Sequence, residues 1–307
     1  ACSIHSISQP HPGMNMPTTV NISAIVVAYD RLDLTLFTLG KLERCTPVPE
    51  EILVHIDGNQ NDLANRIREA YPQIDVWVNE SNVGPGGGRN VLLRRAKHPV
   101  IASFDDDSYP VDADYFARLE RLANDHPEAD VFAASIRERG QVHDASDGST
   151  PLWVADFVGC GCAYRKAFIE QVGGYVPLPV AYGMEEADLA LRLHANGGRI
   201  LFAPALRVFH DTDLSHHSSP GIAGGNIANA ALLPFLRYPL YLMPVGIFQF
   251  ARKVWDTARR KRITGLVRGL RLVVPHLIRN RRWRSPVDGR SVLSFLSLRR
   301  HPRIAHS

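Results

Sequence analysis

The sequence predicts an α/β fold, in which a mostly parallel sheet is covered by helices on both faces. Short apolar runs alternate regularly with segments of helical spacing, and acidic residues directly follow several of the runs. The run at 22–28 is continuous and rich in β-branched residues, which is typical of a strand buried on both faces. This alternation favours right-handed crossovers between parallel strands.

The successive elements can be assigned along the chain. A polar lead-in rich in Pro, Ser and His comes first, and it shows no apolar region of a secretory signal. Apolar runs bounded by turn residues predict strands, and apolar spacing of three and four residues predicts helices. We expect strands at 22–28, 51–56, 74–78, 100–104, 130–136 and 199–209, and helices at 34–42, 62–70, 84–97, 112–124 and from 186 onward.

Three adjacent carboxylates, Asp105, Asp106 and Asp107, follow the fourth expected strand and are called the acidic triplet below. Neighbouring negative charges repel one another, and this repulsion is relieved when a cation lies between them. In an open α/β sheet, the carboxyl ends of the strands are also where ligands bind. Oxygen ligands suit a hard divalent cation that bridges to a substrate's phosphates. The alternative is a solvated acidic turn.

The first two strands bring further polar residues to the same edge. The first strand ends in Ala28, Tyr29 and Asp30, and the second ends before Asp57. Because parallel strands end on the same side of a sheet, we expect these residues to lie near the acidic triplet.

A glycine-rich stretch at 82–90 contains Gly87 and Arg89. It lacks the Lys-Ser/Thr ending of a P-loop and does not fit G-x-G-x-x-G. Its place after the third strand also counts against a dinucleotide-binding fold. Glycines at a helix start allow an anion to approach the backbone, and Arg89 would then reach a phosphate. A tight turn with a solvated arginine is the alternative.

Acidic residues also open the helix expected from Glu186. Glu185, Glu186 and Asp188 lie in its first turn, where the helix dipole favours carboxylates. The functional interpretation is a general base that deprotonates a hydroxyl group. His210 follows the strand at 199–209, where an imidazole would complete a metal site or serve a structural role.

The charge of the chain is unevenly distributed. Residues 251–307 hold sixteen Lys and Arg against two acids, which leaves 19 basic and 29 acidic residues in the rest. An apolar segment at 232–250 precedes this basic tail, but Arg237 and three prolines argue against a clean spanning helix. A surface-lying segment, a core or dimer-packing segment and a membrane span all remain open. Basic clusters suit anionic lipid head groups, and also nucleic acid.

These elements together resemble the inverting nucleotide-sugar glycosyltransferases of family 2, which have a GT-A fold. The resemblance covers residues 21–211. The matching elements are Ala28-Tyr29-Asp30-Arg31, Asp57-Gly58, the stretch 82–90, Phe104 with the acidic triplet, the segment 159–165, Gly174-Tyr175, Glu185-Glu186-Ala187-Asp188-Leu189 with Arg192, and His210.

The resemblance implies roles for these residues. Ala28, Tyr29, Asp30, Asp57, Gly87, Arg89, Asp105 and Asp106 would bind the nucleotide sugar. Asp107 and His210, with Asp105 as a further candidate, would hold Mn²⁺ or Mg²⁺. Glu186 would deprotonate the acceptor, with Glu185 and Asp188 as alternatives. The first element carries Tyr-Asp where many members have Tyr-Asn, which leaves the nucleoside contacts open.

The implied function is metal-dependent, inverting transfer of a sugar from a nucleoside-diphosphate sugar to a hydroxyl of a lipid-linked or soluble glycan. A nucleotidyltransferase or pyrophosphorylase is the alternative. We expect a lead-in at 1–20, a catalytic domain at 21–225 and a helical extension at 226–307.

For the location of the protein, the scattered cysteines favour free thiols in a reducing compartment. We therefore expect a cytoplasmic protein. Because of its basic tail, peripheral binding to the inner face of the membrane is a further expectation. Assembly into a homo-oligomer also remains an open alternative. Nucleic acid is not expected as a partner, because the tail has only Trp255 and Trp283 as stacking aromatics.

Overall fold

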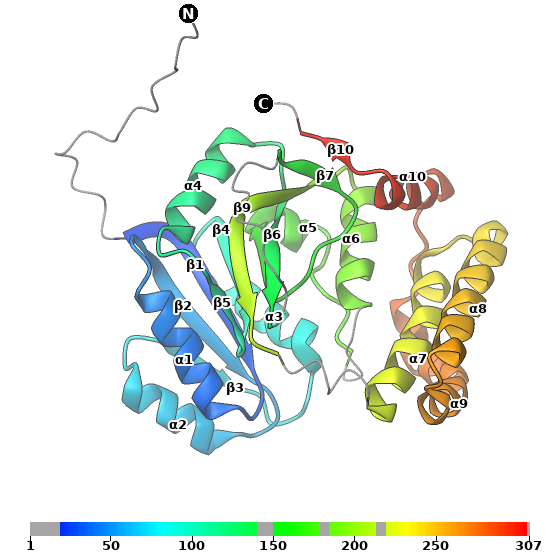
Figure 1. Cartoon of the computed structure of the whole chain (residues 1–307), viewed down its shortest axis with the longest axis horizontal. Coiled ribbons are helices and arrows are strands. Elements are labelled where there is room, and N and C mark those ends of the chain that lie inside the picture. The colour runs from blue at the N-terminus through cyan, green and yellow to red at the C-terminus, as the bar shows by residue number, and fades with distance from the viewer. Residues whose placement is uncertain (1–18, 140–149, 179–183, 213–218, 306–307) are drawn as a thin grey trace, which may run out of the picture.

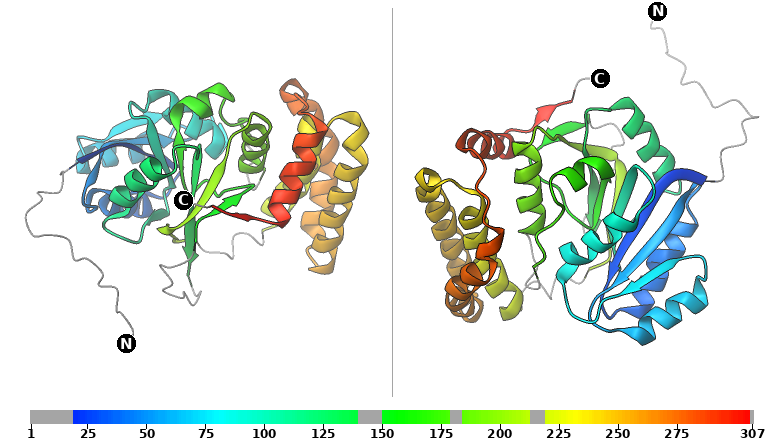
Figure 2. Two further views of the ribbon diagram at one scale, coloured as in Figure 1. Left: turned by 90° about the horizontal axis from the view of Figure 1, so that it is seen from above. Right: turned by 180° about the vertical axis from the view of Figure 1, so that it is seen from behind.

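The computed structural model describes residues 19–139, 150–178, 184–212 and 219–305. A sheet flanked by helices forms the larger part of the molecule (Figure 1). Beside it stands a bundle of three helices, α7 (Pro220–Arg237), α8 (Met243–Arg259) and α9 (Ile263–Asn280), as the views of Figure 2 also show.

Within the described residues the sheet has ten strands, and nine of them follow the order β10-β7-β9-β6-β8-β4-β1-β2-β3, with β5 paired to β9. The strands are β1 (Thr19–Ala28), β2 (Val48–Ile56), β3 (Asp75–Val78), β4 (Val100–Asp105), β5 (Ser108–Pro110), β6 (Val131–Glu138), β7 (Leu152–Val154), β8 (Gly161–Arg165), β9 (Ile200–His210) and β10 (Arg303–Ile304).

Strands β1 to β4 are parallel, and β6 and β9 run in the same direction as these four. Strand β8 lies antiparallel between β4 and β6, and β5 and β7 are antiparallel to β9. The predicted mostly parallel sheet is therefore confirmed. The carboxyl ends of β1, β2 and β4 meet at one edge, because their registers pair Ala28 with Ile56 and Val27 with Asp105.

Helices cover both faces of the sheet, as predicted. The first apolar core joins one face to α1 (Leu32–Glu43), α2 (Asn61–Ala70) and α4 (Tyr115–Asp125). The second core joins the other face to α3 (Gly84–Arg95), α5 (Lys166–Gln171), α6 (Glu185–Ala195) and α10 (Gly289–Arg300). Side chains alternate along β1, with Val26 in the first core and Ile25 and Val27 in the second.

The apolar segment at 232–250 forms parts of two helices joined by a short turn, rather than one helix. Helix α7 ends at Arg237, a short 3₁₀ turn spans Leu240–Leu242, and α8 starts at Met243. Gly246 of α8 lies against Pro234 of α7, where an added Cβ would come within 2.4 Å of the proline ring. Among the helices that the structure describes, none is long and apolar enough to cross a membrane. Helix α7 also runs across residue 225, at which we placed the domain boundary.

Candidate active site

The acidic triplet lies at the sheet edge, and two of its three residues lie in the interior rather than in solvent. Asp105 ends β4, and the Asp106 N–H donates to the carbonyl oxygen of Val27 at the end of β1 (3.0 Å). Asp106 and Asp107 are only 3% and 2% exposed. A solvated acidic turn is therefore excluded for these two residues, and their charges need partners.

Arg31 provides one of those partners, although we had not singled it out as a site residue. Its Nη1 lies 2.6 Å from Asp107 Oδ2, and its Nε and Nη2 donate to the two oxygens of Asp106. Burial nevertheless raises the pKa of Asp106 to about 7, even though Arg31 acts to lower it. The sequence signal for Arg31 was its place directly after Asp30, at the end of the first strand.

His210 joins the triplet through strand pairing. Ser108–Pro110 forms β5, a strand absent from those we expected, and β5 pairs Ser108 with His210. His210 Nε2 therefore lies 3.3 Å from Asp107 Oδ1. Burial lowers the pKa of His210, but hydrogen bonding and charge from Asp107 outweigh it, so the pKa of the imidazole is raised.

The donor atoms at this edge fit a divalent cation. One ligand atom each from Asp105, Cys160 and His210 lie within 4.8 Å of one another. Asp107 Oδ1 is buried, and its polar contact in the structure is the one with His210 Nε2 at 3.3 Å, so a lone pair remains for a ligand. Burial raises the pKa of the Cys160 thiol well above its usual range, and a neutral thiol is a poor ligand for Mg²⁺ or Mn²⁺. Asp105 and His210 thus supply the suitable ligand atoms of this group, Asp107 lies beside His210, and the role of all three as ligands stays a prediction.

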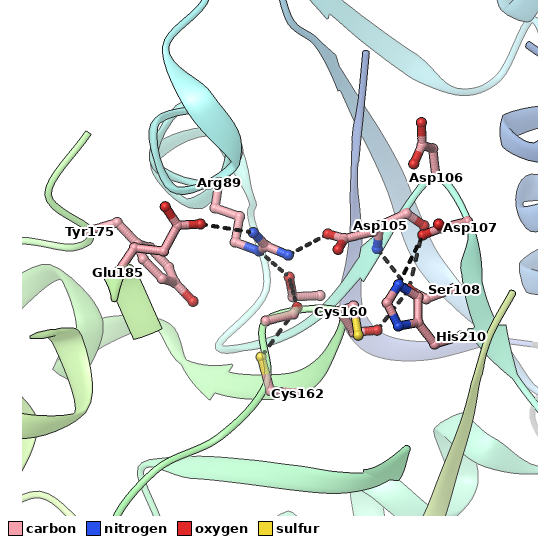
Figure 3. Close-up of polar contacts among 12 residues, drawn as sticks. Arg89, Asp105, Asp106, Asp107, Ser108, Cys160, Cys162, Tyr175, Glu185 and His210 are labelled. Carbon is pink, nitrogen blue, oxygen red and sulfur yellow. Dashed lines mark hydrogen bonds and ion pairs between the residues drawn. The ribbon is translucent and has the colours of Figure 1, made fainter. Parts of the chain in front are cut away.

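Arg89 does not lie where we predicted. Its side chain is 1% exposed and packs 5.9 Å from the ring centroid of Tyr175. Its guanidinium donates to Asp105 and to Ser103 Oγ (3.1 Å), and its Nη1 lies 4.0 Å from Glu185 Oε1. Figure 3 shows Arg89 between Asp105 and Glu185. With its donors committed to protein groups, Arg89 orients carboxylates rather than reaching into solvent for a phosphate.

The two glutamates at the start of α6 differ in accessibility. Glu185 is buried and its Oε2 has no hydrogen-bond partner, whereas Glu186 is partly exposed. The Glu186 carboxylate lies against Gly159, where an added Cβ would come within 2.7 Å of Oε1 and 2.9 Å of Arg89 Cζ. Burial raises the pKa of both glutamates, which favours proton uptake at neutral pH.

Asp188, our other candidate base, has a structural role instead. Its carboxylate is fully buried and forms ion pairs with Arg192 Nε (2.9 Å) and Arg237 Nε (2.5 Å). A buried carboxylate held by two guanidiniums has no access to an acceptor.

The predicted nucleoside pocket is partly closed by the protein's own contacts. Asp57 caps α3, because its two oxygens accept the backbone N–H groups of Val83 and Gly84 at 2.9 Å each. This contact occupies the helix N-terminus that we had expected to bind an anion. Gly87 lies inside the helix, where an added Cβ would come within 2.8 Å of Val83 Cβ. The glycine stretch therefore serves close packing.

Tyr29 and Asp30 remain open to solvent at the end of β1. Tyr29 lies beside Gly58, which follows Asp57 and has a positive φ of 74°. Ala28 is buried, and its carbonyl oxygen accepts the Asp57 N–H (3.0 Å). The structure thus brings Ala28, Tyr29, Asp30 and Asp57 together at one edge, and their nucleotide contacts stay predictions.

Two protein-family sequence models match parts of the chain. Residues 23–173 match the sequence model described as glycosyl transferase family 2. Residues 140–217 match the model described as the N-terminal domain of galactosyltransferase.

Two curated relatives are similar to parts of the chain. An uncharacterized glycosyltransferase, YwdF, of Bacillus subtilis is 23% identical in an alignment 172 residues long that covers 50% of this chain and 61% of the relative. A hyaluronan synthase of Pasteurella multocida is 34% identical over 95 residues, 30% of this chain and 10% of the relative. The matches thus span less than two thirds of either relative.

Solved glycosyltransferase structures share the fold. A mannosyltransferase of Pyrobaculum calidifontis, in complex with GDP-Man and Mn²⁺, has a TM-score of 0.55 at 14% identity, over 92% of this chain and 87% of that one. TarS 1-349 of S. aureus, in complex with UDP-GlcNAc, has a TM-score of 0.54 at 15% identity, over 85% and 91%. GalNAc-T7 with UDP, GalNAc and Mn²⁺ has a TM-score of 0.54 at 16% identity, over 71% and 48%. The predicted GT-A fold is confirmed.

Proposed function

Residues 23–173 make this chain a member of glycosyltransferase family 2, and we propose that it moves a sugar from a nucleoside-diphosphate sugar to an acceptor hydroxyl with inversion at the anomeric carbon. The fold supports this activity, since the solved structures it resembles were crystallised with nucleotide sugars or nucleoside diphosphates. The acceptor that we propose is a hydroxyl of a lipid-linked or soluble glycan.

One observation carries the proposal. Asp105 of the acidic triplet and Glu185 of α6 contact the same buried guanidinium of Arg89, although they are eighty positions apart in the sequence. A set of carboxylates with His210 thus lies on one side of Arg89, and Glu185 at the start of α6 lies on the other (Figure 3). Transfer from a diphosphate donor needs these two features, a place to neutralise the leaving group and a base for the acceptor.

The leaving-group side is assigned to Asp105, Asp107 and His210, which would hold Mn²⁺ or Mg²⁺. When bound, the cation would neutralise charge on the departing nucleoside diphosphate. Asp106 lies on the same turn and would approach the ribose of the donor. Arg31 holds Asp106 and Asp107 in place through its guanidinium.

The acceptor side is assigned to Glu186. Its carboxylate is the accessible member of the glutamate pair, and burial raises its pKa, which makes it a stronger base than an ordinary carboxylate. Glu186 would take the proton of the acceptor hydroxyl as its oxygen attacks the anomeric carbon. Glu185 is buried against Arg89 and would position that guanidinium.

The test is product analysis with labelled UDP-, GDP- and dTDP-sugars, Mn²⁺ or Mg²⁺, and a set of glycan acceptors. We expect one donor to release nucleoside diphosphate and label an acceptor only when the cation is present. Release of pyrophosphate from a nucleoside triphosphate and a sugar phosphate would instead identify the alternative, a nucleotidyltransferase. A thermal-shift screen with nucleoside diphosphates would choose the base first, because a bound ligand stabilises the folded state.

A further inference from the structure

Helix α9 carries an apolar stripe on the outside of the molecule. Its exposed residues Ile263, Val267, Leu270, Val274 and Ile278 follow one another at intervals of four, three, four and four. This spacing puts all five on one side of the helix. We call these five residues the α9 stripe.

The opposite side of α9 is already occupied by the protein. Gly265 and Gly269 pack against Ala223 and Ile227 of α7, where an added Cβ would come within 2.6 and 2.7 Å. His276, farther along the same side, hydrogen bonds to Asn229 of α7 (2.8 Å). The helix is therefore fixed by its glycine side, and the stripe points away from α7.

The exposed apolar residues are concentrated in this part of the chain. Of the seventeen large hydrophobic residues exposed in the described residues, twelve come after residue 239, Phe248 and Trp255 of α8 among them. Single exposed apolar residues are ordinary on a soluble surface, but a contiguous group indicates a binding surface.

Basic residues accompany the stripe. Arg268 and Arg271 line a shallow hollow of about 510 Å³ on α9, together with Ile263, Val267, Thr264 and Leu272. The sequence Arg259-Arg260-Lys261-Arg262 directly precedes the helix, and Arg279 lies at its end. An apolar helix side bordered by guanidiniums is complementary to a surface that carries negative charge on the outside and has an apolar layer directly beneath it.

We propose that the α9 stripe and its arginines dock the protein on an anionic phospholipid bilayer, with α9 lying along the surface of the membrane. Apolar side chains would enter the boundary between head groups and acyl chains while the arginines pair with lipid phosphates. A second copy of the chain fits less well. A two-fold contact through α9 would bring Arg268, Arg271 and the preceding basic cluster toward basic residues of the other copy, with no acidic residue on α9 to oppose them.

The first test is co-sedimentation of the full chain with phosphatidylcholine vesicles, with and without phosphatidylglycerol. We expect binding only to the anionic vesicles, and weaker binding as salt rises. Arg268→Gln/Arg271→Gln and, separately, Leu270→Gln/Val274→Gln should each lower the partition coefficient about tenfold or more. Matched controls are Arg94→Gln/Arg121→Gln, exposed arginines of the catalytic domain, and Val111→Gln. These should bind as the wild type does.

A second measurement uses the unaltered protein. Trp255 is 63% exposed on α8, next to α9, so brominated lipids should quench its fluorescence on binding. The Trp255→Phe variant should lose most of that quenching. Neither measurement needs a sugar donor, so the result is independent of the proposed transfer reaction. The proposal is overturned if the full chain ignores anionic vesicles, if the stripe variants bind unchanged, or if the stripe variants dissociate a dimer that does not bind vesicles.

Discussion

Asp188 and Arg237 form a buried ion pair that ties the helix of the proposed base to the C-terminal helices. Arg237 Nε lies 2.5 Å from Asp188 Oδ1, and both side chains are almost fully buried. The same guanidinium donates to the carbonyl oxygens of Trp283 (3.1 Å) and Ser285 (3.2 Å). The C-terminal region is therefore built into the catalytic domain through α6 and is not a detachable tail.

We expect Arg237→Ala to destabilise the whole protein by about 3–5 kcal/mol, because it leaves the buried Asp188 carboxylate without half of its charge partners. Urea unfolding followed by fluorescence measures this. The control is Arg252→Ala, which removes an exposed pair with Asp256 and should cost about 1 kcal/mol or less. Equal effects of the two variants would contradict a structural role for the Asp188–Arg237 pair.

Removal of a proposed metal ligand should weaken nucleotide binding only when the metal is present. For Asp107→Ala we expect at least a tenfold loss of nucleoside-diphosphate affinity in Mn²⁺ and little change in EDTA, by calorimetry (about 1.4 kcal/mol for tenfold). His210→Ala should raise the Mn²⁺ concentration needed for half-maximal binding. If His210→Ala left that concentration unchanged, His210 would be a structural residue.

Arg31 should stabilise the acidic triplet mainly when no metal is bound. Arg31→Gln leaves two buried carboxylates with fewer partners, so we expect about 1–2 kcal/mol of destabilisation, less than for Arg237 because 43% of the Arg31 side chain is exposed. Mn²⁺ should then raise the melting temperature of Arg31→Gln more than that of the wild type. An equal rise in the melting temperature of both proteins would show that Arg31 does not compensate for the absence of the metal. Arg66→Gln, an exposed arginine on α2, is the control.

Acid should loosen the packing of α9 on α7 through His276. Burial, with a smaller effect of Arg279, lowers the pKa of His276 below its usual value. The unfolded chain then binds more protons than the folded one as the pH falls through about 6.5, so the free energy of unfolding decreases on acidification in that window. His276→Gln should flatten this slope in urea titrations on either side of that pH, whereas exposed His301→Gln should leave it unchanged. A His276→Gln protein with the slope of the wild type would contradict this origin.

The sequence predicted the local elements and their common edge, because apolar periodicity and strand-end position are local features. The strand from Ile22 and the place of the acidic triplet were both predicted in this way. What it could not predict were contacts set by pairing between distant segments. β5 is only three residues long, so no periodicity revealed it, although it brings Asp107 to His210.

The burial of charged side chains was the second feature that local sequence patterns could not predict. We expected the Arg89 side chain to reach a phosphate and Asp188 to be an alternative base, and both roles require an accessible side chain. Their partners, Asp105 for Arg89 and Arg237 for Asp188, lie on elements far along the chain. Only the packed structure shows that these charges are compensated inside the protein.

The most direct test of the proposed active site compares Glu186→Gln with the wild type, once the donor has been identified. Glutamine keeps the shape of the side chain but cannot accept the acceptor's proton, so donor affinity should stay within about twofold while sugar transfer falls by about 10²–10⁴-fold. Donor affinity is measured by calorimetry, and transfer by release of nucleoside diphosphate in the presence of acceptor. A Glu186→Gln protein that transfers sugar at the rate of the wild type would contradict the account, because the accessible glutamate at the start of α6 would then not be the base.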